Sequence, residues 1–126
     1  MSPCNRRSGV IAACIGLALL LAGLPQAAMA HAVLVASDPP IGATIRPGPA
    51  AITLRYNSRI DARRSQLTLS GPSGGTPAVL PIAPGPRQDV LATRASLVPG
   101  GYVLRWQVLA VDGHITRGDV PFTVRP

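Results

Sequence analysis

Sulfur is missing from the sequence after residue 30. Both cysteines, Cys4 and Cys14, and both methionines, Met1 and Met29, lie before that position. A domain formed by residues 31–126 therefore has no disulfide bond, no thiolate nucleophile and no sulfur ligand for a metal ion. Its hydrophobic core alone must hold it together, and 96 residues are enough for one domain and too few for two.

Lysine and aromatic residues are also scarce. Residues 31–126 contain ten arginines, no lysine and five aspartates, a formal charge of +5, with one Trp, two Tyr and one Phe. Such a charge could attract an anionic membrane surface or an acidic partner, but the arginines are scattered among apolar residues, which is typical of the solvated faces of strands. Since Arg63-Arg64 is the single basic pair in this part and few aromatic side chains can stack on bases, we exclude nucleic acid as a partner.

The first thirty residues have the pattern of a secretory signal peptide. A basic pair, Arg6-Arg7, precedes an uncharged apolar run over residues 10–24, and Ala28-Met29-Ala30 has the small residues of a cleavage site. We expect cleavage after Ala30, export, and a mature chain that begins at His31 and has no transmembrane segment. A retained membrane anchor is the alternative, although a spanning helix needs about twenty predominantly apolar residues.

After residue 30, apolar residues recur with a period of two and are interrupted by Gly and Pro at short intervals. This pattern predicts short β-strands, and no stretch of ten residues has the periodicity and caps of a helix. The predicted strands cover residues 32–36, 52–56, 66–70, 78–82, 90–97, 102–110 and 120–124. Seven such strands predict an all-β fold, a two-sheet antiparallel sandwich of immunoglobulin-like or cupredoxin-like shape. Trp106 and Phe122 fall on the apolar faces of their strands, so we expect both in the core.

The chain has only two histidines, and their positions predict a metal site. After cleavage His31 would offer one ion both its α-amine, whose ordinary pKa is about 7.7, and an imidazole nitrogen. Asp112 and His114 are two positions apart, so on an extended backbone both project to the same side. The strand is expected to end by Gly113, which places the pair at the rim of the sandwich, where a ligand can enter.

Three nitrogens and a carboxylate favour Cu(II), which prefers a tetragonal arrangement of nitrogen and oxygen ligands and stands at the top of the divalent affinity order. Zinc is the competing ion, although it prefers a tetrahedral site. The missing sulfur excludes a blue-copper electron carrier and disfavours a Cu(I) site. We expect no enzymatic activity, because both histidines are committed to the metal and no arrangement for nucleophilic catalysis remains.

The mature chain resembles the CopC/PcoC family of periplasmic copper-binding proteins over its whole length. The resemblance begins with His31-Ala32 and continues through Ser-Asp-Pro-Pro-Ile-Gly-Ala at residues 37–43. It is strongest over residues 99–106 and 111–124, where Gly-x-Tyr-x-x-x-Trp is followed by Asp-x-His and a terminal strand. The resemblance implies a small Greek-key β-sandwich domain over residues 31–126.

The resemblance also implies a function: binding, buffering or delivery of copper in periplasmic copper homeostasis or resistance. The implied site holds one Cu(II) per chain on His31, Asp112 and His114, and the implied partner is a CopD-like inner-membrane protein; we expect a monomer. Some relatives carry a Cu(I) site in a methionine-rich loop, but residues 71–86 here contain neither Met nor His, so the chain resembles the Cu(II)-only type. Ser58 stands where many relatives have an acidic side chain near the copper, which changes the surroundings of the site.

Two other functions fit parts of the pattern. Copper-dependent polysaccharide oxygenases also use an N-terminal histidine, but they need a broad substrate platform, usually with exposed aromatic side chains, for which this short chain has little room. A metal-free immunoglobulin-like interaction module would have the same fold, but would leave the pairing of a processed His31 with Asp112 and His114 as coincidence. N-terminal sequencing and the metal content of the exported protein test the expected cleavage point and the expected ion.

Overall fold

The structure, a computed structural model, describes residues 31–126, so the predicted signal peptide, residues 1–30, lies outside the described residues. The described part of the chain consists of strands, loops and turns, and it contains no helix that is long and apolar enough to cross a membrane. The strands, in chain order, are β1 (Leu34–Asp38), β2 (Thr44–Ile45), β3 (Gly48–Tyr56), β4 (Ile60–Ser70), β5 (Ala78–Leu80), β6 (Ala83–Pro84), β7 (Val90–Leu97), β8 (Gly100–Ala110) and β9 (Ile115–Val124).

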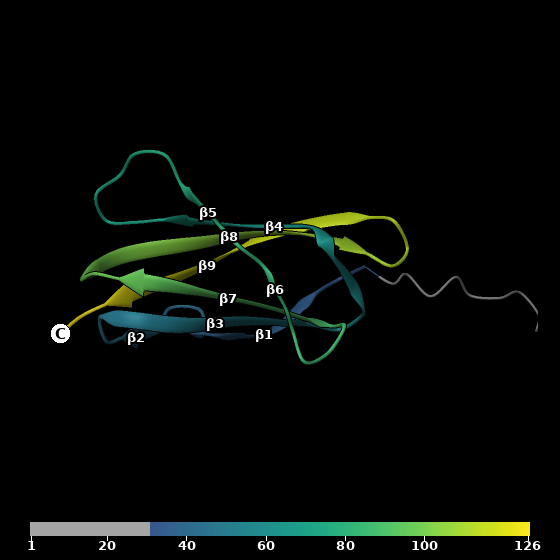
Figure 1. The fold of residues 1–126 in the computed structure, drawn as a ribbon, viewed down its shortest axis with the longest axis horizontal. Coiled ribbons are helices and arrows are strands. Elements are labelled where there is room, and N and C mark those ends of the chain that lie inside the picture. The colour runs from purple at the N-terminus through teal and green to yellow at the C-terminus, as the bar shows by residue number, and fades with distance from the viewer. Residues whose placement is uncertain (1–30) are drawn as a thin grey trace, which may run out of the picture.

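The strands form two sheets that pack face to face (Figure 1). One sheet has the order β1-β3-β7-β6 and the other has the order β2-β9-β8-β4-β5. Neighbouring strands are antiparallel except for the short parallel pair of β2 with β9. Consecutive strands β3 and β4 belong to different sheets, as do β7 and β8, and such crossings are typical of a Greek-key sandwich.

The predicted all-β sandwich is confirmed, and a strand is present in each of the seven predicted regions. The described residues contain two further strands, β2 and β6, which are two residues long and therefore too short to show a period of two. β4 begins at Ile60, earlier than predicted. The sequence pattern missed the first part of this strand because its register shifts between Asp61 and Gln66, which breaks the alternation. β9 begins at Ile115, where exposed and half-buried residues alternate without a buried apolar face.

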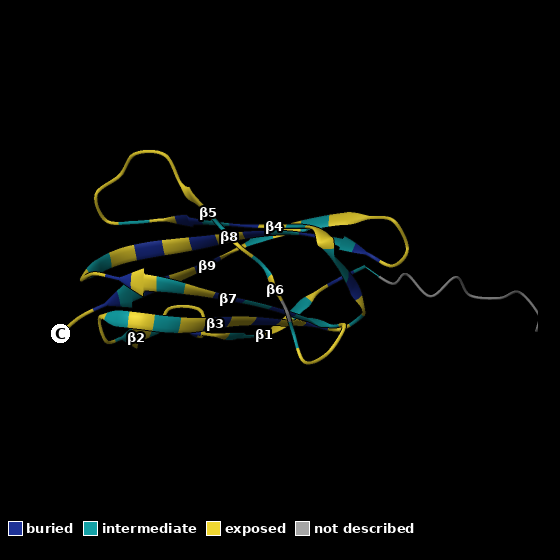
Figure 2. Ribbon diagram, viewed as in Figure 1, coloured by how far each residue is buried: buried dark blue, intermediate teal, exposed yellow. Residues whose placement is uncertain are grey.

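The core lies between the sheets and is built from alternate residues of the long strands, as the banding of β8 in Figure 2 shows. Trp106 and Phe122 are only 6% and 3% exposed, so the prediction that both lie in the core is confirmed. Tyr56 packs edge-to-face against Trp106 with ring centroids 5.3 Å apart. The buried apolar set comprises Ala32, Ile52, Leu54, Tyr56, Ile60, Leu67, Leu69, Leu91, Leu97, Tyr102, Leu104, Trp106, Val108, Ala110, Val120, Phe122 and Val124.

The indole of Trp106 requires a glycine on the neighbouring strand. Trp106 in β8 lies directly opposite Gly118 in β9. A Cβ atom at position 118 would lie 2.4 Å from Cζ2 and 2.7 Å from Cε2 of the indole. Glycine at 118 therefore provides the space in which the largest side chain of the core packs.

We expect Gly118→Ala to lower the free energy of unfolding by about 1–3 kcal/mol, because the added methyl group forces the indole out of its position. Urea unfolding followed by Trp106 fluorescence measures the change. Gly101→Ala in β8 is the matched control, since a Cβ there meets nothing within 4 Å. Equal stability of the Gly118→Ala variant and the parent would contradict this packing.

Candidate metal centre

A tight turn between β8 and β9 carries Asp112 and His114. It is closed by two hydrogen bonds, from the amide of Gly113 to the carbonyl of Ala110 at 3.0 Å and from the amide of Ala110 to the carbonyl of His114 at 2.9 Å. Gly113 has a φ of +85°, a conformation that favours glycine. Because β8 ends at Ala110, both side chains lie at the rim of the sandwich, as predicted.

The N-terminal segment of the described chain is attached beside this turn. The carbonyl of Ala32 accepts a hydrogen bond of 3.0 Å from the hydroxyl of Thr116, 84 positions along the chain, and Ala32 is only 2% exposed. The amide of Val33 donates to Oδ1 of Asn57 at 2.8 Å, and the amide of Asn57 donates to the carbonyl of Val33 at 3.0 Å. These contacts hold His31 at the end of the sandwich where the β8–β9 turn lies (Figure 1).

The two histidines and Asp112 form one cluster. Their candidate ligand atoms all lie within 4.8 Å of one another. Oδ2 of Asp112 is 3.0 Å from Nδ1 of His114 and 3.7 Å from Nδ1 of His31. The imidazole rings meet edge to face, with centroids 4.8 Å apart and planes at 75°. The structure thus brings together all three side chains that the sequence predicts as metal ligands.

The two carboxylate oxygens of Asp112 have different surroundings. Oδ1 accepts a hydrogen bond of 3.0 Å from the backbone amide of His114, and this bond is the main reason why the pKa of Asp112 lies below its ordinary value. The carboxylate is therefore ionised at neutral pH, and Oδ2 points its charge toward the two imidazoles. Because Oδ1 is hydrogen-bonded within the turn, Oδ2 is the oxygen available to a metal ion.

Nδ1 of His31 is the unsatisfied atom of the cluster. It is buried from solvent and has no hydrogen-bond partner among residues 31–126, although buried polar atoms are normally paired. Its distance of 3.7 Å from Oδ2 of Asp112 is too long for a hydrogen bond. Two ligands that each lie about 2 Å from one ion are separated by up to about 4 Å, so an ion bridging these atoms fits with small side-chain movements. Two imidazoles and a carboxylate suit Cu(II) or Zn(II).

Two residues that position the cluster were not predicted from the sequence. Asn57 and Thr116 hold the segment next to His31, but neither is a metal-ligand type, and no local pattern indicates that they bind residues 32 and 33. Ser58, which the resemblance places near the site, follows Asn57 directly. Its Oγ is buried and has no hydrogen-bond partner within the described part of the chain.

Fold and cluster together define a small two-sheet β-sandwich that carries a two-histidine, one-aspartate site at its rim. Residues 34–125 match the family model of the CopC domain. Protein YobA of Escherichia coli strain K12 is 32% identical to this chain over 99 residues, which cover 76% of this chain and 80% of YobA. The protein therefore belongs to the CopC family, and the resemblance inferred from its motifs is confirmed.

Two solved structures share this sandwich. CopC from Methylosinus trichosporium OB3b matches with a TM-score of 0.67 and 25% identity, covering 76% of this chain and 95% of that protein. PcoC from Escherichia coli, described as a methionine rich copper resistance protein, matches with a TM-score of 0.64 and 25% identity, covering 76% of this chain and 100% of PcoC. In contrast to that description, residues 31–126 here contain no methionine.

We expect Thr116→Val to loosen the N-terminal segment without unfolding the sandwich, because it removes the hydrogen bond to Ala32 and keeps a side chain of similar shape. The free energy of opening at the Val33 amide, measured by NMR hydrogen exchange, should fall by about 1 kcal/mol. Thr123→Val, in the same strand at its other end, is the control and should leave Val33 unchanged. Unaltered protection in Thr116→Val would show that this bond does not hold the segment.

Proposed function

We propose that this protein is a periplasmic Cu(II)-binding protein that serves copper homeostasis or resistance. In this proposal residues 1–30 are a cleaved signal peptide and residues 31–126 are the mature domain. The observation that carries it is the approach of His31 to Asp112 and His114, residues far apart in the sequence that the fold brings within 4.8 Å. The relatives whose descriptions name copper resistance support copper over other ions.

The proposed ligands are His31, Asp112 and His114, with one Cu(II) per chain. Cleavage after Ala30 would free the α-amine of His31, which would add a second nitrogen from the same residue. The amine, two imidazoles and a carboxylate form a nitrogen-rich set without sulfur, which favours Cu(II) over Cu(I). Oδ2 of Asp112 contributes negative charge, and its position next to both rings supports a role as a direct ligand.

Exposure of the site supports exchange of copper with other proteins rather than catalysis. The side chain of His114 is 65% exposed, so an incoming ligand can reach the metal from solvent. We propose a monomer that buffers or delivers copper and acts beside a CopD-like inner-membrane protein. Ser58, where many relatives have an acidic residue, would leave the surroundings of the copper less negative than in those relatives.

Removal of His114 should change the copper spectrum. We expect the exported protein to bind one equivalent of Cu(II) with a nitrogen-rich tetragonal EPR signal, and His114→Ala to lose one nitrogen coupling and at least about ten-fold in affinity. Asp112→Asn should weaken binding as well, because it removes the negative charge of Oδ2.

The matched control is Asp119→Asn, which removes an aspartate of β9 that is bonded to Arg105 instead of the cluster. This variant should bind copper like the parent. An unchanged EPR spectrum in His114→Ala would overturn the assignment of that ligand.

Extension of the mature N-terminus tests the amine. N-terminal sequencing of the exported protein should give His-Ala-Val, and a variant with one glycine inserted before His31 should lose at least about ten-fold in Cu(II) affinity, because the α-amine moves away while the sandwich stays folded. Competition with a copper chelator measures the affinity. Full affinity in the extended variant would show that the amine is not a ligand, and a start at another residue would overturn the proposed cleavage.

A further inference from the structure

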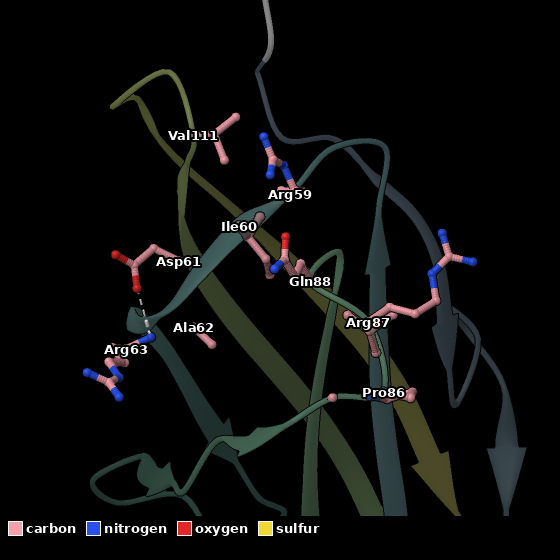
Figure 3. Close-up of a pocket in the computed structure, with 11 residues that line it drawn as sticks. Arg59, Ile60, Asp61, Ala62, Arg63, Pro86, Arg87, Gln88 and Val111 are labelled. Atoms are coloured by element: carbon pink, nitrogen blue, oxygen red, sulfur yellow. Dashed lines mark hydrogen bonds between the residues drawn. The ribbon is translucent and has the colours of Figure 1, made fainter.

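A groove runs beside the candidate metal centre, between the first part of β4 and the loop at residues 85–90 (Figure 3). It has a volume of about 580 Å³. Val111, which directly precedes Asp112, forms one end of the groove together with Arg59, and Arg63 lies toward the other end. Any molecule in this groove would therefore lie against the turn that carries two of the proposed copper ligands.

Two arginines, Arg59 and Arg63, border the groove on the β4 side. Arg59 and Arg63 are exposed, and neither has a carboxylate within ion-pair distance in residues 31–126. The groove also contains one acidic residue, Asp61, whose carboxylate binds other residues of β4. Its Oδ1 accepts hydrogen bonds from the amides of Arg63 at 3.0 Å and Arg64 at 3.3 Å, and its Oδ2 lies 3.7 Å from Nε of Arg64.

Arg87, on the opposite wall, is already neutralised. Its guanidinium binds both carboxylate oxygens of Asp89 at 2.9 Å, and Figure 3 shows its side chain pointing away from the groove. The uncompensated positive charge therefore comes from Arg59 and Arg63, both on the β4 side.

The groove also offers apolar contact. Val111 is 57% exposed, and the side of Ile60 that is not buried in the core lines the groove below it. The exposed Val111 lies beside Arg59, and Arg63 lies toward the other end of the groove. An extended segment with an apolar side chain and carboxylates would cover this surface.

We propose that this groove is a docking site for an extended acidic segment of a partner protein. Arginine presents a planar fork that matches a carboxylate with two hydrogen bonds, which favours aspartate or glutamate as the recognised groups. Because Arg59 and Arg63 lie toward opposite ends of the groove, an extended segment with one carboxylate toward each end can meet both of them. A concave groove suits a chain segment better than the flat surface of a bilayer. Docking here places the partner at the rim of the metal centre.

The test uses the exported protein without metal and two probe peptides. One is an unstructured peptide with glutamates four positions apart and a valine between them, and the other has glutamines in place of the glutamates. We expect NMR amide shifts at residues 59–63, 87–88 and 111 with the glutamate peptide alone. The double variant Arg59→Ala/Arg63→Ala should weaken binding by about ten-fold, the effect of two partly exposed ion pairs.

The matched control is the double variant Arg46→Ala/Arg125→Ala, which removes the same charge. Both residues are exposed and follow β2 and β9 at the opposite end of the sandwich, where the amide of Arg125 donates to the carbonyl of Ile45. Binding in this variant should stay within about two-fold of the parent. Trp106 fluorescence during urea unfolding verifies that both double variants keep the fold.

Three outcomes would overturn the docking site. If both double variants weakened peptide binding equally, net charge alone would explain the attraction. If the glutamine peptide bound as tightly as the glutamate peptide, carboxylates would not be the recognised groups. Binding to phosphatidylglycerol vesicles that depends on Arg59 and Arg63, without binding of the glutamate peptide, would show a membrane surface in place of a protein partner. Because the assay contains no metal and neither arginine is a proposed ligand, failure here is distinguishable from failure of the copper proposal.

Discussion

Attachment of residues 32 and 33 to the sandwich is the constraint on which the candidate metal centre depends. The hydroxyl of Thr116 and the side chain of Asn57 bind the backbone of these two residues and bury Ala32. A terminal segment without such contacts would sample many conformations, and ordering it around an ion would cost conformational entropy. Here the contacts order the segment when the chain folds, so ion binding does not bear that cost. His31 is thus held beside Asp112 before any ion binds.

The second element of the centre is local. The β8–β9 turn uses the left-handed conformation of Gly113 and the hydrogen bond from the His114 amide to Oδ1 of Asp112. That bond lowers the pKa of Asp112 and orients its carboxylate, so that Oδ2 faces both imidazoles. One hairpin therefore supplies both a carboxylate and an imidazole, and the attached N-terminal segment completes the cluster.

Both elements lie at one end of the sandwich, and most of its core is made by other residues. Trp106 packs on Gly118, and Tyr56 packs on Trp106, so the interior supports the rim without contributing polar groups to it. Membership of the CopC family places this arrangement among β-sandwich proteins of the same fold. The unpaired arginines of the neighbouring groove are a surface feature that the core does not require. In the docking proposal their role is recognition of a partner.

The sequence by itself determined the class of fold, the core positions and the family. Period-two alternation is a local property, so it identifies the seven main strands and places Trp106 and Phe122 inside. The sequence also yields His31, Asp112 and His114 as candidate ligands, because it has only two histidines, one directly after the expected cleavage site and one two positions after Asp112.

Only the tertiary structure decided that these three side chains meet, since Ala32 and Thr116 are 84 positions apart and contact requires the closed sandwich. The same holds for the anchoring role of Asn57, for the early part of β4 with its shifted register, and for the groove between β4 and the 85–90 loop. Hydrogen bonds between distant segments depend on how the strands pair and pack, and no local periodicity encodes that pairing.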